Sequence, residues 1–268
     1  PYTTLFRSGL LYNAKSYCEA AELAKKLLPQ QTDPAKKTEL DGILGFSQAN
    51  CTDSIEALKN LRTYFSMQQP SKITSGAYIQ FGQLFMKLDM LDSAGFYYTK
   101  GAKLDTGKNK TDVLRDVAEA FKAKKNYCKS AEWYGNIIRA NPETQQLDYF
   151  WCGCMYYYCG DYPKSLTAFV SFEKKYPDSN PAIYWEGRAA AAIDSEAKTG
   201  AADSAFTRWL ANVGPNYDKK NDLKIAYEYL LLYHYNIKDK EKAKAYEDKL
   251  KEIDPGNNLA KQIDDAEK

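Results

Sequence analysis

Very few side chains in this chain could perform metal or acid–base chemistry, because its 268 residues include six cysteines and a single histidine. His234 has no second histidine with which to form a typical metal site, and no serine or cysteine motif surrounds it. Glycine-rich phosphate loops, the paired histidines of zinc proteases and the nucleophile-elbow pattern are absent from the sequence. We therefore expect no catalytic residue, no metal site and no cofactor. We interpret the chain as a non-enzyme and His234 as a packing residue.

The composition excludes several further classes of protein. Thirty-seven basic and 35 acidic residues leave a net charge of +2, which provides no general attraction for nucleic acid or an anionic membrane. No apolar run approaches the ~18 residues that a membrane-spanning helix needs. Fifteen glycines and 10 prolines are too few for a disordered or collagen-like chain. These numbers favour a folded scaffold without a membrane span.

The first eight residues, 1–8, match one reading frame of a common short-read sequencing adapter. We interpret them as an artefact and exclude them from the prediction of the fold. The natural chain then begins near Gly9, inside a helix, and the absence of a signal peptide carries no information about the compartment. The alternative is an ordinary polar segment that matches the adapter by chance.

Residues of related type recur along the chain at intervals of thirty-odd positions, which is typical of solenoids. The clearest recurrence pairs Asn126-Tyr127, Ser130-Ala131, Tyr134 and Pro142 with Asp161-Tyr162, Ser165, Phe169 and Pro177. Small residues recur where two helices must approach closely, and large ones recur where helices interlock. A proline follows the second helix, as at Pro142, Pro177 and Pro255, where it can end that helix.

This pattern resembles the tetratricopeptide (TPR) repeat. Segment 146–179 carries the signature most fully, at Tyr149, Cys152-Gly153, Tyr156, Gly160-Asp161-Tyr162, Ser165, Phe169, Phe172 and Pro177. It departs from the family pattern in having Cys152 for a leucine, and serine and phenylalanine for the two alanines of the second helix. The resemblance implies an all-α fold, a right-handed α-solenoid of antiparallel helix pairs that forms a TPR superhelix. The alternative is a series of generic helical hairpins without TPR register.

We expect about seven units, at 9–34 (partial), 38–71, 75–108, 111–144, 146–179, 180–219 and 224–257, followed by a capping helix over 258–268. In the sixth unit, residues 195–200 lengthen the turn between the helices, an insertion that costs little entropy. Segment 184–189 (YWEGRA), together with this turn, resembles TPR proteins of Bacteroides-type bacteria, which are commonly exported. That resemblance implies the periplasm or cell envelope, with the cytoplasm as the alternative.

Four cysteines occupy equivalent places in this register. Cys18 and Cys128 begin the second helix of a unit, whereas Cys51 and Cys159 lie at the inter-helix turn of the following unit. Such positions should be close in a stack, so Cys18–Cys51 and Cys128–Cys159 could form disulfides in an oxidising compartment. The alternative is packed thiols in a reducing cytosol.

The TPR resemblance also implies a ligand-binding surface, because the first helices of such units line the concave side of the superhelix. Carried over by register, the ligand-facing residues are Phe150, Cys154, Tyr157, Tyr158, Tyr184, Arg188, Arg115, Glu119, Leu232 and Tyr235. Aromatic rings with flanking charges suit extended peptides or helices. Arg115 is followed by Glu119 where the TPR carboxylate clamp has asparagine, which disfavours capture of an acidic C-terminal tail.

We therefore predict a non-catalytic scaffold that binds a protein or peptide in its concave face, with no nucleic-acid partner. One alternative is a glycan-binding envelope component, although exported helical-repeat glycan-binding proteins carry large insertions that this compact array lacks. Another is a regulatory module of a larger protein.

Overall fold

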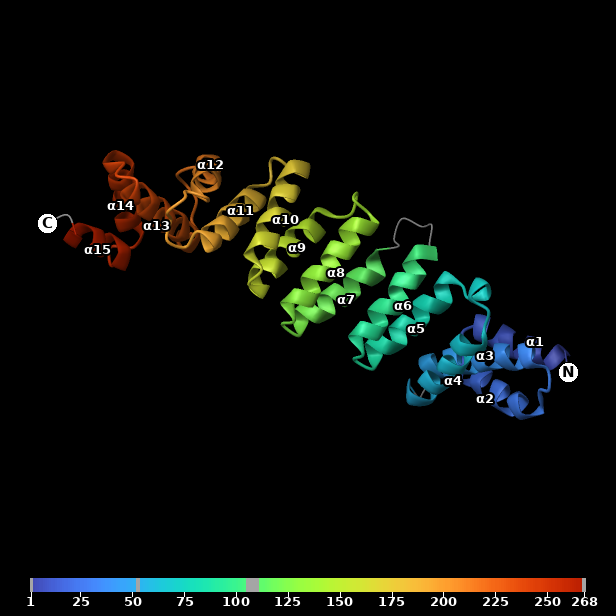
Figure 1. Ribbon diagram of the computed structural model, residues 1–268. Coiled ribbons are helices and arrows are strands. Elements are labelled where there is room, and N and C mark those ends of the chain that lie inside the picture. Colours follow the sequence, from blue (N-terminus) through green and yellow to red (C-terminus); the bar gives the residue numbers. More distant parts are fainter. Residues whose placement is uncertain (1, 52–53, 105–110, 267–268) are drawn as a thin grey trace. The chain divides into compact units, whose positions relative to one another are not determined.

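The computed structural model describes residues 2–51, 54–104 and 111–266, and over these residues the chain is α-helical without strands (Figure 1). Two short 3-10 turns, η1 (Leu28–Gln30) and η2 (Pro70–Lys72), follow α2 and α4. The α-helices are α1 (Tyr2–Asn13), α2 (Tyr17–Leu27), α3 (Pro34–Cys51), α4 (Ser54–Met67), α5 (Ser75–Lys87), α6 (Leu91–Leu104), α7 (Asp112–Ala123), α8 (Tyr127–Ala140), α9 (Gln146–Cys159), α10 (Tyr162–Lys175), α11 (Asn180–Ile193), α12 (Asp203–Val213), α13 (Lys220–Asn236), α14 (Lys240–Ile253) and α15 (Asn258–Ala266).

The chain divides into two compact units, residues 1–120 and 121–268. In the N-terminal unit α2 packs against α1 and α3, α4 against α3, and α6 against α5. In the C-terminal unit α9 packs against α8 and α10, α11 against α10 and α12, and α14 against α13. The principal contacts thus join helices that are adjacent, or next but one, along the chain. This confirms the predicted all-α solenoid, because in such arrays each repeat touches only its neighbours.

Glycines in the first helices allow the paired helices to approach closely. A Cβ atom added to Gly153 on α9 would lie 2.6 Å from the ring of Phe169 on α10. One added to Gly187 on α11 would lie 2.7 Å from the ring of Phe206 on α12. Both rings are 0% exposed and fill the space that the missing side chains leave. The same relation holds at Gly45–Leu61 and Gly82–Tyr98.

The turn inside a helix pair is built from a residue with positive φ and a capping side chain. Gly160 has φ 84° and Lys238 has φ 62°, a conformation that reverses the chain at the end of the first helix. The next residue, Asp161 or Asp239, begins the second helix and accepts a hydrogen bond from a backbone N–H three positions later. The sequence pattern therefore specifies where α10 and α14 begin.

The long turn after α11 is organised by one carboxylate. Asp194 accepts hydrogen bonds from the backbone N–H groups of residues 198–201 and from the hydroxyls of Thr199 and Tyr229. Although burial opposes the effect, these hydrogen bonds lower the pKa of Asp194. The inserted residues thus form an ordered turn that is linked to α13 by the hydrogen bond between Tyr229 and Asp194.

The last helix covers the apolar ends of the preceding pair. Ala260 and Ile263 on α15 are buried in a cluster with Leu231, Ala243 and Leu250 from α13 and α14. Residues 267–268 of the predicted capping helix lie outside the described residues.

We predict that Gly153→Ala lowers the free energy of unfolding by about 1–3 kcal/mol, because the buried ring of Phe169 leaves no room for a methyl group. Gly135→Ala is the matched control: its Cβ would be no nearer than 3.7 Å to another residue, at Arg139 Nη1. In that helix the change should stabilise by up to about 1 kcal/mol. Urea unfolding followed by circular dichroism measures both, and equal effects would contradict the close-approach argument.

Candidate functional site

Two disulfides join helices of successive pairs at equivalent places. One connects Cys18 at the start of α2 to Cys51 at the end of α3, with the Cα atoms 5.3 Å apart. The other connects Cys128 at the start of α8 to Cys159 at the end of α9, with the Cα atoms 5.0 Å apart. These are the pairs that the repeat register places together. The other two cysteines, Cys152 and Cys154, are buried and form no disulfide.

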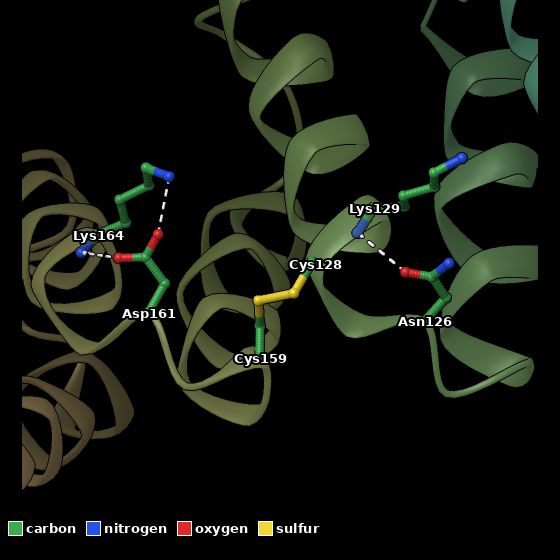
Figure 2. Close-up of a disulfide and its surroundings, with 6 residues drawn as sticks. All are labelled: Asn126, Cys128, Lys129, Cys159, Asp161 and Lys164. Atoms are coloured by element: carbon green, nitrogen blue, oxygen red, sulfur yellow. Dashed lines mark hydrogen bonds and ion pairs between the residues drawn. A yellow bond between two sulfur atoms is a disulfide. The ribbon is translucent and has the colours of Figure 1, made fainter.

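The second disulfide lies among the polar caps of the helices that it joins. Figure 2 shows the Cys128–Cys159 bond with Asn126, which caps α8, and Asp161, which caps α10. Asp161 also forms an ion pair with Lys164, with Oδ2 and Nζ 2.7 Å apart. The disulfide therefore joins the start of α8, which Asn126 caps, to the turn between α9 and α10, where Asp161 caps α10.

A groove of about 600 Å³ lies in the C-terminal unit. Its walls come from the first half of α11, the end of α12 and the turn that leads into α13, and α9 contributes one ring. The lining residues are Phe150, Asn180, Pro181, Tyr184, Trp185, Arg188, Trp209, Asn212, Val213, Tyr217, Lys219 and Asp222.

Trp185 on α11 is the centre of the aromatic wall. Its ring centroid lies 6.4 Å from that of Phe150, 5.2 Å from that of Tyr157 and 5.8 Å from that of Tyr158. The sequence analysis identified its three neighbours but missed Trp185 itself. The sequence does contain a signal for Trp185. This residue follows Tyr184 in the first helix of a unit, one position after a residue of the TPR ligand register.

The aromatic rings of this wall hold the side chain of Arg188 in place. Its guanidinium carbon lies 4.5 Å from the ring centroid of Trp185 and 4.8 Å from that of Tyr157, within the range of cation–π interactions. Arg188 Nη2 also donates a hydrogen bond of 3.2 Å to the Tyr157 hydroxyl. These contacts fix the orientation of the cation in the groove.

Asp222 is the carboxylate that lines the groove, and two tyrosines hold it. The hydroxyl of Tyr184 donates to Oδ1 at 3.0 Å, and that of Tyr217 donates to Oδ2 at 2.8 Å. Burial and the hydrogen bond to Asp222 raise the pKa of Tyr217 to about 12. The sequence analysis missed Asp222 and Tyr217 because they reach the groove from the turn before α13 and the start of that helix.

Several predicted ligand-facing residues are placed differently. Cys154 is 1% exposed, so its assignment as a ligand contact is wrong: burial encloses the thiol and raises its pKa. Tyr184 lines the groove but is only 6% exposed, because its ring packs against Trp209 with the centroids 4.7 Å apart. Leu232 and Tyr235 on α13 are not among the groove-lining residues. Leu232 packs against the core cluster that includes Tyr184 and Trp209, and Tyr235 packs against the cluster of α13, α14 and α15.

The remaining two predicted residues, Arg115 and Glu119, lie on α7 in the N-terminal unit. Arg115 forms an ion pair there with Asp112, with Nη1 and Oδ1 2.7 Å apart.

His234 occupies a core position on α13, where it is 2% exposed. Its Nε2 lies 3.1 Å from a carboxylate oxygen of Asp203, and its ring stacks on Tyr246 with the centroids 5.6 Å apart. Within residues 2–51, 54–104 and 111–266, no group of three or more His, Cys, Asp or Glu side chains is arranged to hold a metal ion. Among the helices described, none has the length and apolar character needed to cross a bilayer.

Two carboxylates, from α10 and α11, share one arginine from α12. Nη2 of Arg208 on α12 lies 3.0 Å from Oε2 of Glu186 on α11 and 3.3 Å from Oε2 of Glu173 on α10. Burial, followed by the hydrogen bond and negative charge of Glu173, raises the pKa of Glu186 to about 7. The hydrogen bond with Glu186 and the contact with Arg208 lower the pKa of Glu173. The pair therefore retains one proton under mildly acidic conditions.

Similar solved structures are TPR repeat proteins. The C-terminal part of a TPR repeat-containing protein from Cytophaga hutchinsonii is 25% identical, with 96% of this chain and 98% of that chain covered and a TM-score of 0.53. A tetratricopeptide repeat protein from Parabacteroides merdae is 13% identical, with 98% and 96% covered and a TM-score of 0.43. YrrB, described as a TPR protein with an unusual peptide-binding site, is 18% identical, with 72% and 93% covered and a TM-score of 0.48.

No protein-family model and no curated protein matches the chain. The Cytophaga structure nevertheless covers nearly all of both chains with the same helical architecture. The fold is therefore that of the TPR repeat proteins, a class of helical scaffolds.

We predict that the protein becomes more stable as the pH falls from about 7 towards 4.5. In this interval folded Glu186 retains a proton that the unfolded chain, with the ordinary pKa of 4.5, releases. Above about pH 7 Glu186 is ionised in both states and this contribution is lost. Urea unfolding across the interval measures the slope. Glu186→Gln should flatten it, whereas Glu132→Gln, an exposed change on α8, should not. An equal slope in the Glu186→Gln variant would contradict the assignment.

Proposed function

We propose that this protein is a non-catalytic scaffold that binds a protein or peptide segment in the groove of its C-terminal unit. The observation that carries the proposal is the open, ring-lined groove of about 600 Å³. Aromatic rings with few rotatable bonds bury a large area at low entropic cost, which is why they dominate binding surfaces. The groove also holds the amides of Asn180 and Asn212, which can donate and accept hydrogen bonds along a peptide backbone.

The geometry supports an extended segment as the ligand. The aromatic wall continues from the groove to Tyr157 and to Tyr158, which is 50% exposed and whose ring lies 5.6 Å from that of Tyr127 on α8. A row of rings contributed by α8, α9 and α11 suits a ligand longer than one residue.

We further propose that the protein works in an oxidising compartment, the periplasm or cell envelope. Two cysteine pairs are bonded at equivalent positions, and disulfides persist mainly outside the reducing cytosol. Each bond closes a loop of thirty-odd residues, which stabilises a fold by about 2–4 kcal/mol.

The binding proposal is tested by selecting peptides from a phage library of random dodecapeptides on the immobilised protein. We predict that Phe150→Ala with Tyr157→Ala weakens the selected peptides at least about tenfold, because two rings of the wall are lost. Phe96→Ala, which removes a ring that is 54% exposed on α6, should leave the affinity unchanged. Circular dichroism checks that each variant is folded. Unchanged affinity in the double variant, or capture of neutral oligosaccharides in place of peptides, would contradict the proposal.

The compartment proposal is tested by counting thiols in protein purified from the periplasm. We predict two reactive thiols, from Cys152 and Cys154, after denaturation without reductant, and six after reduction. Finding six thiols in the unreduced, exported protein would mean that the disulfides do not form.

A further inference from the structure

We propose that the groove selects a peptide segment in which an aspartate or glutamate adjoins an apolar side chain, and that Arg188 binds the acidic group. This inference rests on the proposed function and specifies the chemistry of its ligand.

The first argument is that Arg188 is oriented but lacks a counter-ion. The rings of Trp185 and Tyr157 and the Tyr157 hydroxyl hold the guanidinium in place. Over the described part of the chain, no carboxylate oxygen lies within 4.0 Å of its nitrogens. A guanidinium matches a carboxylate well. A ligand carboxylate in the groove, which Arg188 lines, would supply the missing counter-charge.

The second argument is the charge of the groove. Its charged lining residues are two cations, Arg188 and Lys219, and one anion, Asp222, which gives one net positive charge. Both carboxylate oxygens of Asp222 already accept hydrogen bonds from tyrosine hydroxyls within the same unit. Asp222 is therefore already hydrogen-bonded to residues of the groove wall. The net positive charge of the lining residues favours an anionic ligand.

The third argument concerns the kind of anion. A nucleic acid needs several cations along its phosphates, whereas this groove offers two, beside a carboxylate. The partly exposed rings of Phe150 and Trp185 line the same space and provide an apolar surface beside the charge. An acidic side chain next to an apolar one matches both features, so a peptide fits better than a polyphosphate.

The experiment compares selected dodecapeptides with analogues in which glutamine replaces each acidic residue, all with blocked ends so that only side chains carry charge. Binding is followed by tryptophan fluorescence, since Trp185 and Trp209 line the groove. We expect selected sequences to share an acidic residue beside an apolar one. The glutamine analogue should bind about 10- to 100-fold more weakly, and the difference should shrink as salt is added.

Variants of Arg188 test whether this side chain causes the preference for acidic peptides. Arg188→Gln should bind the acidic and glutamine peptides within about twofold of each other, because the charge-assisted bond is gone. Arg188→Lys should recover part of the preference, since it retains the charge but not the planar fork. Arg139→Gln on α8, outside the groove lining, should retain the full preference.

The outcomes separate this inference from the proposed function. Peptides that are selected without acidic residues, or that bind their glutamine analogues equally well, would overturn the role of Arg188 and leave peptide binding intact. The wild-type comparison alone decides this if an Arg188 variant fails to fold. Enrichment of no peptide above background would overturn both proposals.

Discussion

The close approach of paired helices, made possible by a glycine that faces a large buried side chain, is the constraint on which the rest of the structure depends. At Gly153–Phe169 and Gly187–Phe206 the second helix supplies a ring and the first helix supplies the space for it. This interlock fixes the rotation of each first helix, because only the face with the glycine can meet the second helix. The interlock also supports the aromatic wall, because the ring centroid of Phe169 lies 6.0 Å from that of Trp185 and 6.4 Å from that of Phe150.

Polar groups stabilise the same elements that build the groove. The Asp222 carboxylate joins Tyr184 of α11 to Tyr217 of the turn before α13, and Asp194 joins the inserted turn to Tyr229 of α13. Buried polar groups stabilise only when their partners are in place, so these bonds position the walls at the same time. The groove and the fold therefore share residues, and the same hydrogen bonds position the groove walls.

Cross-links between successive pairs complement this packing. A solenoid has few contacts between residues distant in sequence, so it depends on its neighbour-to-neighbour interfaces. Each disulfide covers one such interface, from the start of a second helix to the end of the next first helix. The Glu173–Glu186–Arg208 cluster spans another, across α10, α11 and α12, and makes it responsive to pH. The disulfides and the ionic cluster thus stabilise the same kind of interface, the one between successive helix pairs.

The amino-acid sequence by itself determined the helix pairs, the turn after each first helix and the cysteine positions that fall together, because all of these follow from a local repeat. It also identified Phe150, Tyr157 and Arg188 through the repeat register. Only the tertiary structure decided that Cys154 is enclosed, that Trp185 is the centre of the ring wall and that Asp222 is already engaged. The reason is physical: register assigns a residue to a helix face, but burial and pairing depend on side chains that arrive from a third helix or from an irregular turn.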